Sequence, residues 1–117
     1  MTVSERFLKY VSFPTTSDED SPSTPSSPLE KDLGAFLADE LKAIGLSGVH
    51  MDEKGYVYGY LPATEGLEAL PRIGFIAHMD TSPAVSGTNI KPRRLVYQGG
   101  DIPLNENTSI RGIWPSG

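Results

Sequence analysis

The sequence of 117 residues predicts an α/β fold of the size of one small domain. Three observations support this prediction. Apolar residues recur at helical spacing over residues 33–44, apolar and polar residues alternate over 49–61, and residues 73–77 form a continuous run without charge. Such a run is typical of a strand that is covered on both faces, as in the sheet of an α/β protein.

The composition describes a globular chain and argues against several kinds of partner. The formal net charge is −5, which argues against nucleic acid or an anionic membrane as a partner. The absence of cysteine excludes a thiolate zinc site and a cysteine nucleophile, and it is compatible with a reducing cytoplasm. The first residues lack the apolar core of a signal peptide, and no apolar run approaches the roughly 20 residues that span a bilayer. We therefore expect a soluble, cytoplasmic protein.

The N-terminal residues predict a short helix followed by a loop. Thr2 and Glu5 have the spacing of a capping box, and the helix should end near Ser12 because Pro14 disfavours helix in the residue before it. One face of this helix is apolar, with Val3, Phe7, Leu8 and Val11. Residues 14–28 are almost all Ser, Thr, Pro and acidic residues, a composition that predicts an exposed loop.

The second helix has the clearest signals at both ends. Ser27 is predicted to be its N-cap, Pro28 lies in the first turn, and Glu30 completes a capping box. Gly45 is a natural stop. The apolar stripe predicts a face that packs in the core, made of Leu33, Phe36, Leu37, Leu41 and Ile44.

A hairpin of two strands is predicted next. Val49 and Met51 alternate with polar residues, and residues 52–55 have the composition of a turn. Three tyrosines, Tyr56, Tyr58 and Tyr60, share one face of the second strand. We interpret this face as half-buried under a helix rather than as a platform for bases, and His50 as a structural residue.

A buried strand over residues 72–77 is predicted to end at His78 and Asp80. Ligands of open α/β sheets gather just beyond the carboxyl ends of strands, so this position favours a functional role for the pair. Residues 95–97 are a candidate for one more short strand, and 99–101 for a turn.

The spacing of His78 and Asp80 indicates two kinds of chemistry. On an extended chain, residues two apart point the same way. An imidazole is a good zinc ligand, and its second N–H usually donates to a carboxylate, which Asp80 could provide. Alternatively, the pair could activate a serine, and Ser82 and Ser86 lie nearby, although neither is in a nucleophile-elbow pattern.

The sequence does not provide a complete metal site. A catalytic zinc ion needs about three protein ligands, and His78 is the one convincing candidate. Asp80, Asp101 and Glu106 are possible oxygen donors, but nothing in their spacing recommends them.

Several stretches resemble the peptidase T group of aminotripeptidases in the M20 zinc metallopeptidase family. They are MDEKGYVYGYLPAT, PRIGFIAHMDTSP, NIKPRRLVYQGGDIPLN and SPSTPSSPLEKDLGAFLADELKAIGL. The resemblance covers residues 1–105, whereas residues 106–117 depart from the family pattern. It implies that residues 1–105 are the N-terminal part of a zinc-exopeptidase-like catalytic domain, with a mixed sheet and flanking helices.

The same resemblance implies a function and two site residues. Family members are two-zinc exopeptidases that release the N-terminal residue from tripeptides. By its position in the motif, His78 would be a zinc ligand and Asp80 the catalytic carboxylate that holds it in place. The other ligands and the general-base glutamate come later in family members, so we expect this chain to be inactive alone. The alternatives are another M20 dipeptidase or deacylase, and a small α/β fragment without catalytic function.

Overall fold

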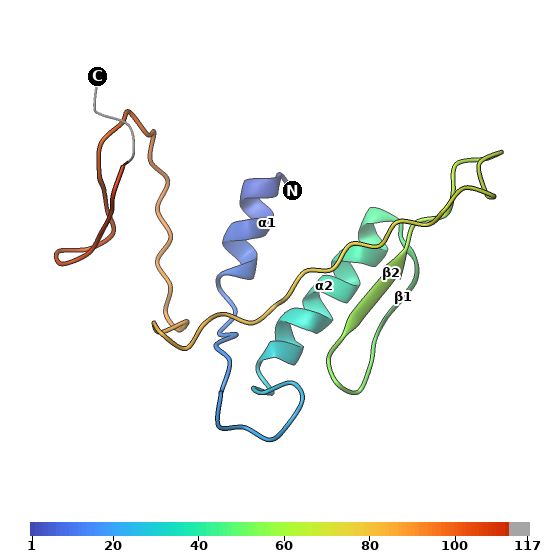
Figure 1. Ribbon diagram of the computed structural model, residues 1–117, viewed down its shortest axis with the longest axis horizontal. Helices are drawn as coiled ribbons and strands as arrows, with labels where there is room; N and C mark the ends of the chain where they lie inside the picture. The colour runs from blue at the N-terminus through green and yellow to red at the C-terminus, as the bar shows by residue number, and fades with distance from the viewer. Residues whose placement is uncertain (113–117) are drawn as a thin grey trace.

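The computed structural model describes residues 1–112 and contains two helices and two small sheets (Figure 1). Each sheet is an antiparallel pair of strands, β1 with β2 and β3 with β4. The elements follow one another along the chain as α1 (Val3–Tyr10), α2 (Glu30–Ile44), β1 (Ser47–Met51), β2 (Val57–Tyr60), β3 (Ile102–Pro103) and β4 (Ser109–Ile110). The described part of the chain is therefore a mixed α/β arrangement, as predicted.

Helix α1 begins with the predicted capping box. The Glu5 N–H donates to Thr2 Oγ1 at 3.2 Å, and the Thr2 N–H donates to Glu5 Oε2 at 2.7 Å. The helix ends at Tyr10, and a turn leads from it to Pro14. The prediction of this helix is confirmed at both ends.

Helix α2 ends where the sequence predicts and begins later. Gly45 follows its last residue with φ of 103°, in the left-handed region that glycine adopts without strain. At the start, Leu29 rather than Ser27 is the N-cap. The predicted cap at Ser27 is wrong by two residues. The turn before the helix is closed by hydrogen bonds between residues three apart, as in a 3₁₀ turn, such as that from the Lys31 N–H to the Pro28 carbonyl at 3.1 Å. The carboxylate of the predicted box is nevertheless in place, since Glu30 Oε1 accepts from the Ser27 N–H at 3.1 Å.

Helix α2 packs on the β1–β2 hairpin, and the small core lies there. Strands β1 and β2 pair as predicted, with His50 opposite Tyr58 and Met51 opposite Val57. Gly34 of α2 allows the close approach, since a Cβ built there would lie 2.8 Å from Met51 Sδ. The apolar side chains that are buried in the described chain are Leu33 and Ala38, with 5% and 6% of their surfaces exposed.

The tyrosine face of β2 does not pack under a helix, so that interpretation is wrong. Tyr56, Tyr58 and Tyr60 expose 53%, 48% and 44% of their surfaces. The other face of the strand meets α2, where a Cβ built at Gly59 would lie 3.5 Å from Leu41 Cδ1. One helix covers one face of the two-stranded sheet, and Tyr58 and Tyr60 of β2 occupy the uncovered face.

The predicted strand over residues 72–77 is absent from the described structure. This stretch is extended but has no strand partner, and Ile73, Phe75 and Ile76 expose 81%, 94% and 102% of their surfaces. Residues 95–97 likewise form no strand, and the predicted mixed sheet is not present among residues 1–112. A covered strand needs neighbours along its edges and layers on its faces, and the described residues supply neither.

The loop over residues 14–28 contacts the chain far beyond the hairpin. Thr16 and Thr81 form a parallel bridge, in which the Thr81 N–H donates to the Thr15 carbonyl at 2.9 Å and the Ser17 N–H donates to the Thr81 carbonyl at 3.0 Å. Thr15 is consequently buried, with 3% of its surface exposed, although the composition predicts an exposed loop. We call this contact the Thr16–Thr81 bridge.

Neither helix of the described residues is long and apolar enough to cross a membrane.

Candidate metal-ligand site

His78 and Asp80 lie at the end of the extended stretch, immediately before an anchored residue. The Thr16–Thr81 bridge fixes the backbone at Thr81, one residue after Asp80. The chain before His78 is unpaired, so the position of the pair depends on this anchor. The anchor is not predictable from the sequence, because nothing local to Thr16 or Thr81 marks residues 65 positions apart as neighbours.

The imidazole of His78 has one nitrogen engaged by Asp80. Nδ1 lies 3.0 Å from Asp80 Oδ1 and 2.9 Å from the Asp80 carbonyl oxygen. Both partners are acceptors, so Nδ1 carries the proton, and in the neutral ring Nε2 keeps its lone pair. This is the tautomer that a metal-ligating histidine adopts when a carboxylate or carbonyl holds its other nitrogen.

The pair is largely exposed to solvent. The side chain of His78 is 84% exposed and that of Asp80 is 41% exposed. An ion pair in such surroundings contributes little to stability, about 0–1 kcal/mol even when the histidine is charged. The contact therefore orients the ring more than it stabilises the chain.

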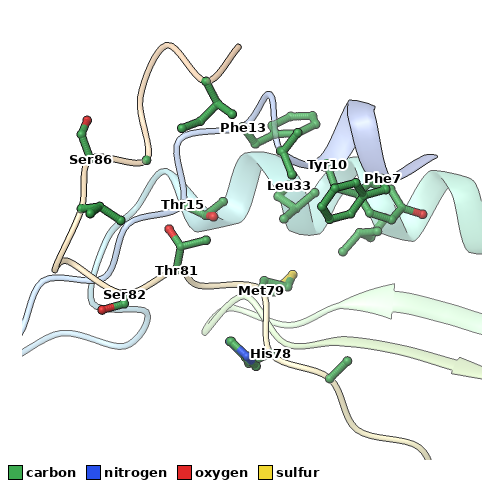
Figure 2. A pocket seen from close by; sticks show the side chains of 16 residues that line it. Phe7, Tyr10, Phe13, Thr15, Leu33, His78, Met79, Thr81, Ser82 and Ser86 are labelled. Carbon is green, nitrogen blue, oxygen red and sulfur yellow. The ribbon is translucent and has the colours of Figure 1, made fainter. Parts of the chain in front are cut away.

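Two cavities meet at His78. The larger, about 530 Å³, lies between apolar side chains of the two helices and residues 77–90, as Figure 2 shows with Phe7, Tyr10 and Leu33 on one side and His78 and Met79 on the other. The smaller, about 370 Å³, is lined by the turn at Gly55, the loop around Pro25 and the same stretch of chain. His78 contributes to the wall of both cavities, so its ring is accessible from two sides.

The described residues fit one ligand position of a zinc ion and not a complete site. No group of three His, Asp or Glu side chains that could hold a metal ion occurs among residues 1–112. Asp101 and Glu106, the other candidate oxygen donors, do not join His78. Asp101 Oδ1 accepts from the Gly112 N–H at 3.0 Å, and Glu106 is exposed in the connection between β3 and β4.

The serine alternative has no geometric support within the described chain. Ser82 Oγ accepts from the Ala84 N–H at 3.2 Å, and Ser86 Oγ lies 2.9 Å from Thr88 Oγ1. Both hydroxyls therefore make local turn contacts, and neither is hydrogen bonded to His78.

The second histidine, His50, makes local contacts within the hairpin. His50 Nδ1 lies 2.9 Å from the Gly48 carbonyl, and its ring stacks on Tyr58 with 4.9 Å between centroids. It belongs to the uncovered face of the hairpin and contacts neither His78 nor Asp80.

Sequence comparison connects the chain to one class of enzyme, the peptidases. It is 48% identical over 110 residues to peptidase T of Parabacteroides distasonis, which is 94% of this chain and 27% of that protein. It is 52% identical over 109 residues to peptidase T of Clostridium acetobutylicum, and 51% identical over 110 residues to peptidase T of Desulfitobacterium hafniense, each alignment covering 26% of the relative. No protein-family model matches the chain.

The chain is therefore homologous to peptidase T along nearly its whole length, and the resemblance found in its motifs is confirmed. It spans about a quarter of the length of the curated relatives that it matches.

Proposed function

We propose that this chain is one part of a cytoplasmic, zinc-dependent aminotripeptidase and that it contributes a zinc ligand, His78, and the carboxylate that orients it, Asp80. The substrates would be tripeptides, from which the N-terminal residue is released. The similarity to peptidase T supports the enzyme class. The observation that carries the site is the contact of His78 Nδ1 with Asp80, 3.0 Å from the carboxylate oxygen, which leaves Nε2 free to bind a metal.

Each residue has a separate task in this proposal. Asp80 accepts the hydrogen bond from Nδ1–H with its carboxylate and with its backbone carbonyl, and so fixes both the tautomer and the ring plane. His78 then presents the lone pair of Nε2 to a metal ion. Zinc, when bound, supplies Lewis-acid polarisation of a peptide carbonyl and makes a water molecule more acidic. The remaining ligands would have to come from outside residues 1–112, because these residues gather no set of three.

A chimera tests this proposal. The matching quarter of Clostridium acetobutylicum peptidase T, to which this chain is 52% identical, is replaced by this chain. We expect the chimera to hydrolyse a tripeptide and to lose this activity when a zinc chelator is added. A His78→Ala change should reduce hydrolysis to the level of the chelator-treated protein and lower the zinc content. Asp80→Ala should retain more zinc and lose roughly 10–100-fold in kcat/KM, the usual effect of removing a ligand's hydrogen-bond partner.

His50→Ala is the matched control, since it removes the other histidine of the chain, which is also exposed. Its zinc content and activity should equal those of the unmodified chimera. An active chimera in which His78→Ala has no more effect than His50→Ala would disprove the role of His78. A chimera that folds, binds zinc and leaves tripeptides intact would refute the proposed activity.

A further inference from the structure

The most unusual surface of the described chain is the apolar stretch from Ile73 to Ala77, which we call the bare segment. Ile73, Phe75 and Ile76 are almost fully exposed, at 81%, 94% and 102%. The five residues contain no charge and no proline. An extended, uncharged and apolar segment of this kind is a ready partner for another strand.

The backbone of the bare segment is unpaired, and its apolar side chains are uncovered. Within the described residues, none of its N–H or carbonyl groups takes part in a backbone hydrogen bond, although the chain resumes such bonds at Thr81. A row of open donors and acceptors is what β-augmentation requires, since main-chain hydrogen bonds provide the affinity.

The side-chain pattern says what kind of partner would fit. Successive side chains of an extended chain point to opposite faces, so Phe75 lies on one face and Ile76 on the other. A second copy of the bare segment could pair along its edge, but it would leave both apolar faces in water. The fitting partner must provide strands for the edges and layers for both faces, and therefore must be a polypeptide with a core of its own.

The relatives indicate where such a polypeptide is found. Peptidase T of Clostridium acetobutylicum contains a stretch 52% identical to this chain, in a protein about four times as long, of which the alignment covers 26%. In that protein the matching segment is joined to about three quarters of the chain that the alignment does not cover.

From these observations we propose that the bare segment docks onto the remaining three quarters of a peptidase T when that part is supplied as a separate polypeptide. The partner adds backbone hydrogen bonds along the segment and covers Phe75 on one face and Ile76 on the other. Docking places His78, which directly follows the segment, against the partner's surface. The consequence for zinc rests on the proposed function, but the docking itself requires only the bare segment.

The experiment uses the full 117-residue chain with the tagged remainder of the Clostridium acetobutylicum protein, co-expressed in one cell. We expect the two polypeptides to purify together as an equimolar complex by affinity and size-exclusion chromatography. Phe75→Asp should abolish the complex. It should not alter the fold of the chain alone, because 94% of the Phe75 surface is exposed; the circular dichroism spectrum checks this.

Val3→Asp is the matched control, because Val3 is also highly exposed, at 84%, and lies at the start of α1, where an acidic residue is favourable. The complex should persist in this variant. Equal loss in both variants, or a chain that forms homodimers and no mixed complex, would overturn the inference.

The co-expression experiment tests the docking inference separately from the proposed function, which the chimera tests. If the two polypeptides do not associate and the covalent chimera is active, the docking inference fails and the function stands. If they associate and neither complex nor chimera hydrolyses tripeptides, the docking inference stands and the function fails.

Discussion

Glu40 illustrates how a single residue joins two elements of this chain. Its side chain is 8% exposed, and its Oε1 lies 2.6 Å from Arg6 Nη1. The Tyr10 hydroxyl donates to its other oxygen. A carboxylate removed from water needs such partners, and both come from α1, so the cluster holds α1 against α2.

Tyr10 gives this cluster a pH dependence. Burial, reinforced by the neighbouring Glu40 carboxylate, raises the pKa of Tyr10 above its ordinary value of 10.0. The folded state therefore favours the neutral phenol. The stability that this provides is complete below pH 10 and is lost as the pH rises through the raised pKa.

We expect Tyr10→Phe to lower the free energy of unfolding by about 1 kcal/mol at neutral pH, because a hydrogen bond to Glu40 is removed. The variant should also lose part of the decline in stability above pH 10. Urea unfolding followed by far-UV circular dichroism, at neutral and at alkaline pH, measures both effects. Tyr97→Phe, whose hydroxyl donates to the Gly100 carbonyl at 3.0 Å, is the control and should keep the wild-type decline. If the free energy of unfolding of Tyr10→Phe declines above pH 10 as steeply as that of the wild type, the Tyr10 phenol does not cause the decline.

At the scale of elements, α2 and the β1–β2 hairpin are the best-organised part of the molecule. Strands β1 and β2 pair with each other, and glycines at 34 and 59 bring the helix close to the sheet. The left-handed residue Gly45 then turns the chain from α2 into β1.

Gly45→Ala should destabilise this unit through the backbone alone. The φ of 103° lies in a region that costs an L-residue about 1–2 kcal/mol, and a Cβ built at Gly45 has no atom within 4 Å. Gly45→Asn should cost less, because asparagine tolerates this conformation better. Urea unfolding of the three proteins provides the ranking. Equal stability of the alanine variant and the wild type would show that the turn does not depend on glycine.

The elements that the sequence predicted well are those whose signals are local. The capping box of α1, the stop at Gly45 and the turn after Met51 each depend on residues a few positions apart. Residues 72–77 have the composition of a strand, but a strand forms only with partners, and the described chain offers none. The strands β3 and β4 are two residues each, too short to leave a periodic signal.

The candidate site is predictable in part, because part of its signal is also local. His78 and Asp80 are two residues apart, so their contact follows from the geometry of an extended chain. The bridge that anchors the next residue, Thr81, joins distant segments and leaves no local signal. The roles of the two residues in binding zinc stay predictions.

At the scale of the whole molecule, the chain is expanded. Its radius of gyration is 18.4 Å, whereas a compact chain of this length has about 13 Å. Its accessible surface is 9666 Å², compared with about 6,200 Å² for a folded monomer of this mass. Figure 1 shows the cause, because the chain after β2 runs out to a tip and back across the molecule before reaching the small β3–β4 hairpin.

Such a chain should neither bind zinc tightly nor hydrolyse tripeptides when it is alone. One accessible imidazole is a weak ligand, and the described residues bring no second or third donor to it. Zinc titration by calorimetry and a tripeptide assay, each with His78→Ala as the comparison, check this expectation. Tight stoichiometric binding that disappears in His78→Ala would contradict it.

The Thr16–Thr81 bridge has a consequence for the order of folding. Its bonds join Thr81 to Thr15 and Ser17, which are 66 and 64 positions away, and closing a flexible loop of that length costs about 4 kcal/mol of entropy. Three hydrogen bonds stabilise the bridge, two between backbone groups and one from the Ser17 hydroxyl. Together they contribute roughly 1.5–4.5 kcal/mol. If the bridge formed first, its net stability would be close to zero. Once α2 and the β1–β2 hairpin have formed, the loop that remains to be closed is shorter, and the bridge becomes favourable. The backbone next to His78 should therefore become ordered last, after α2 and the hairpin have folded.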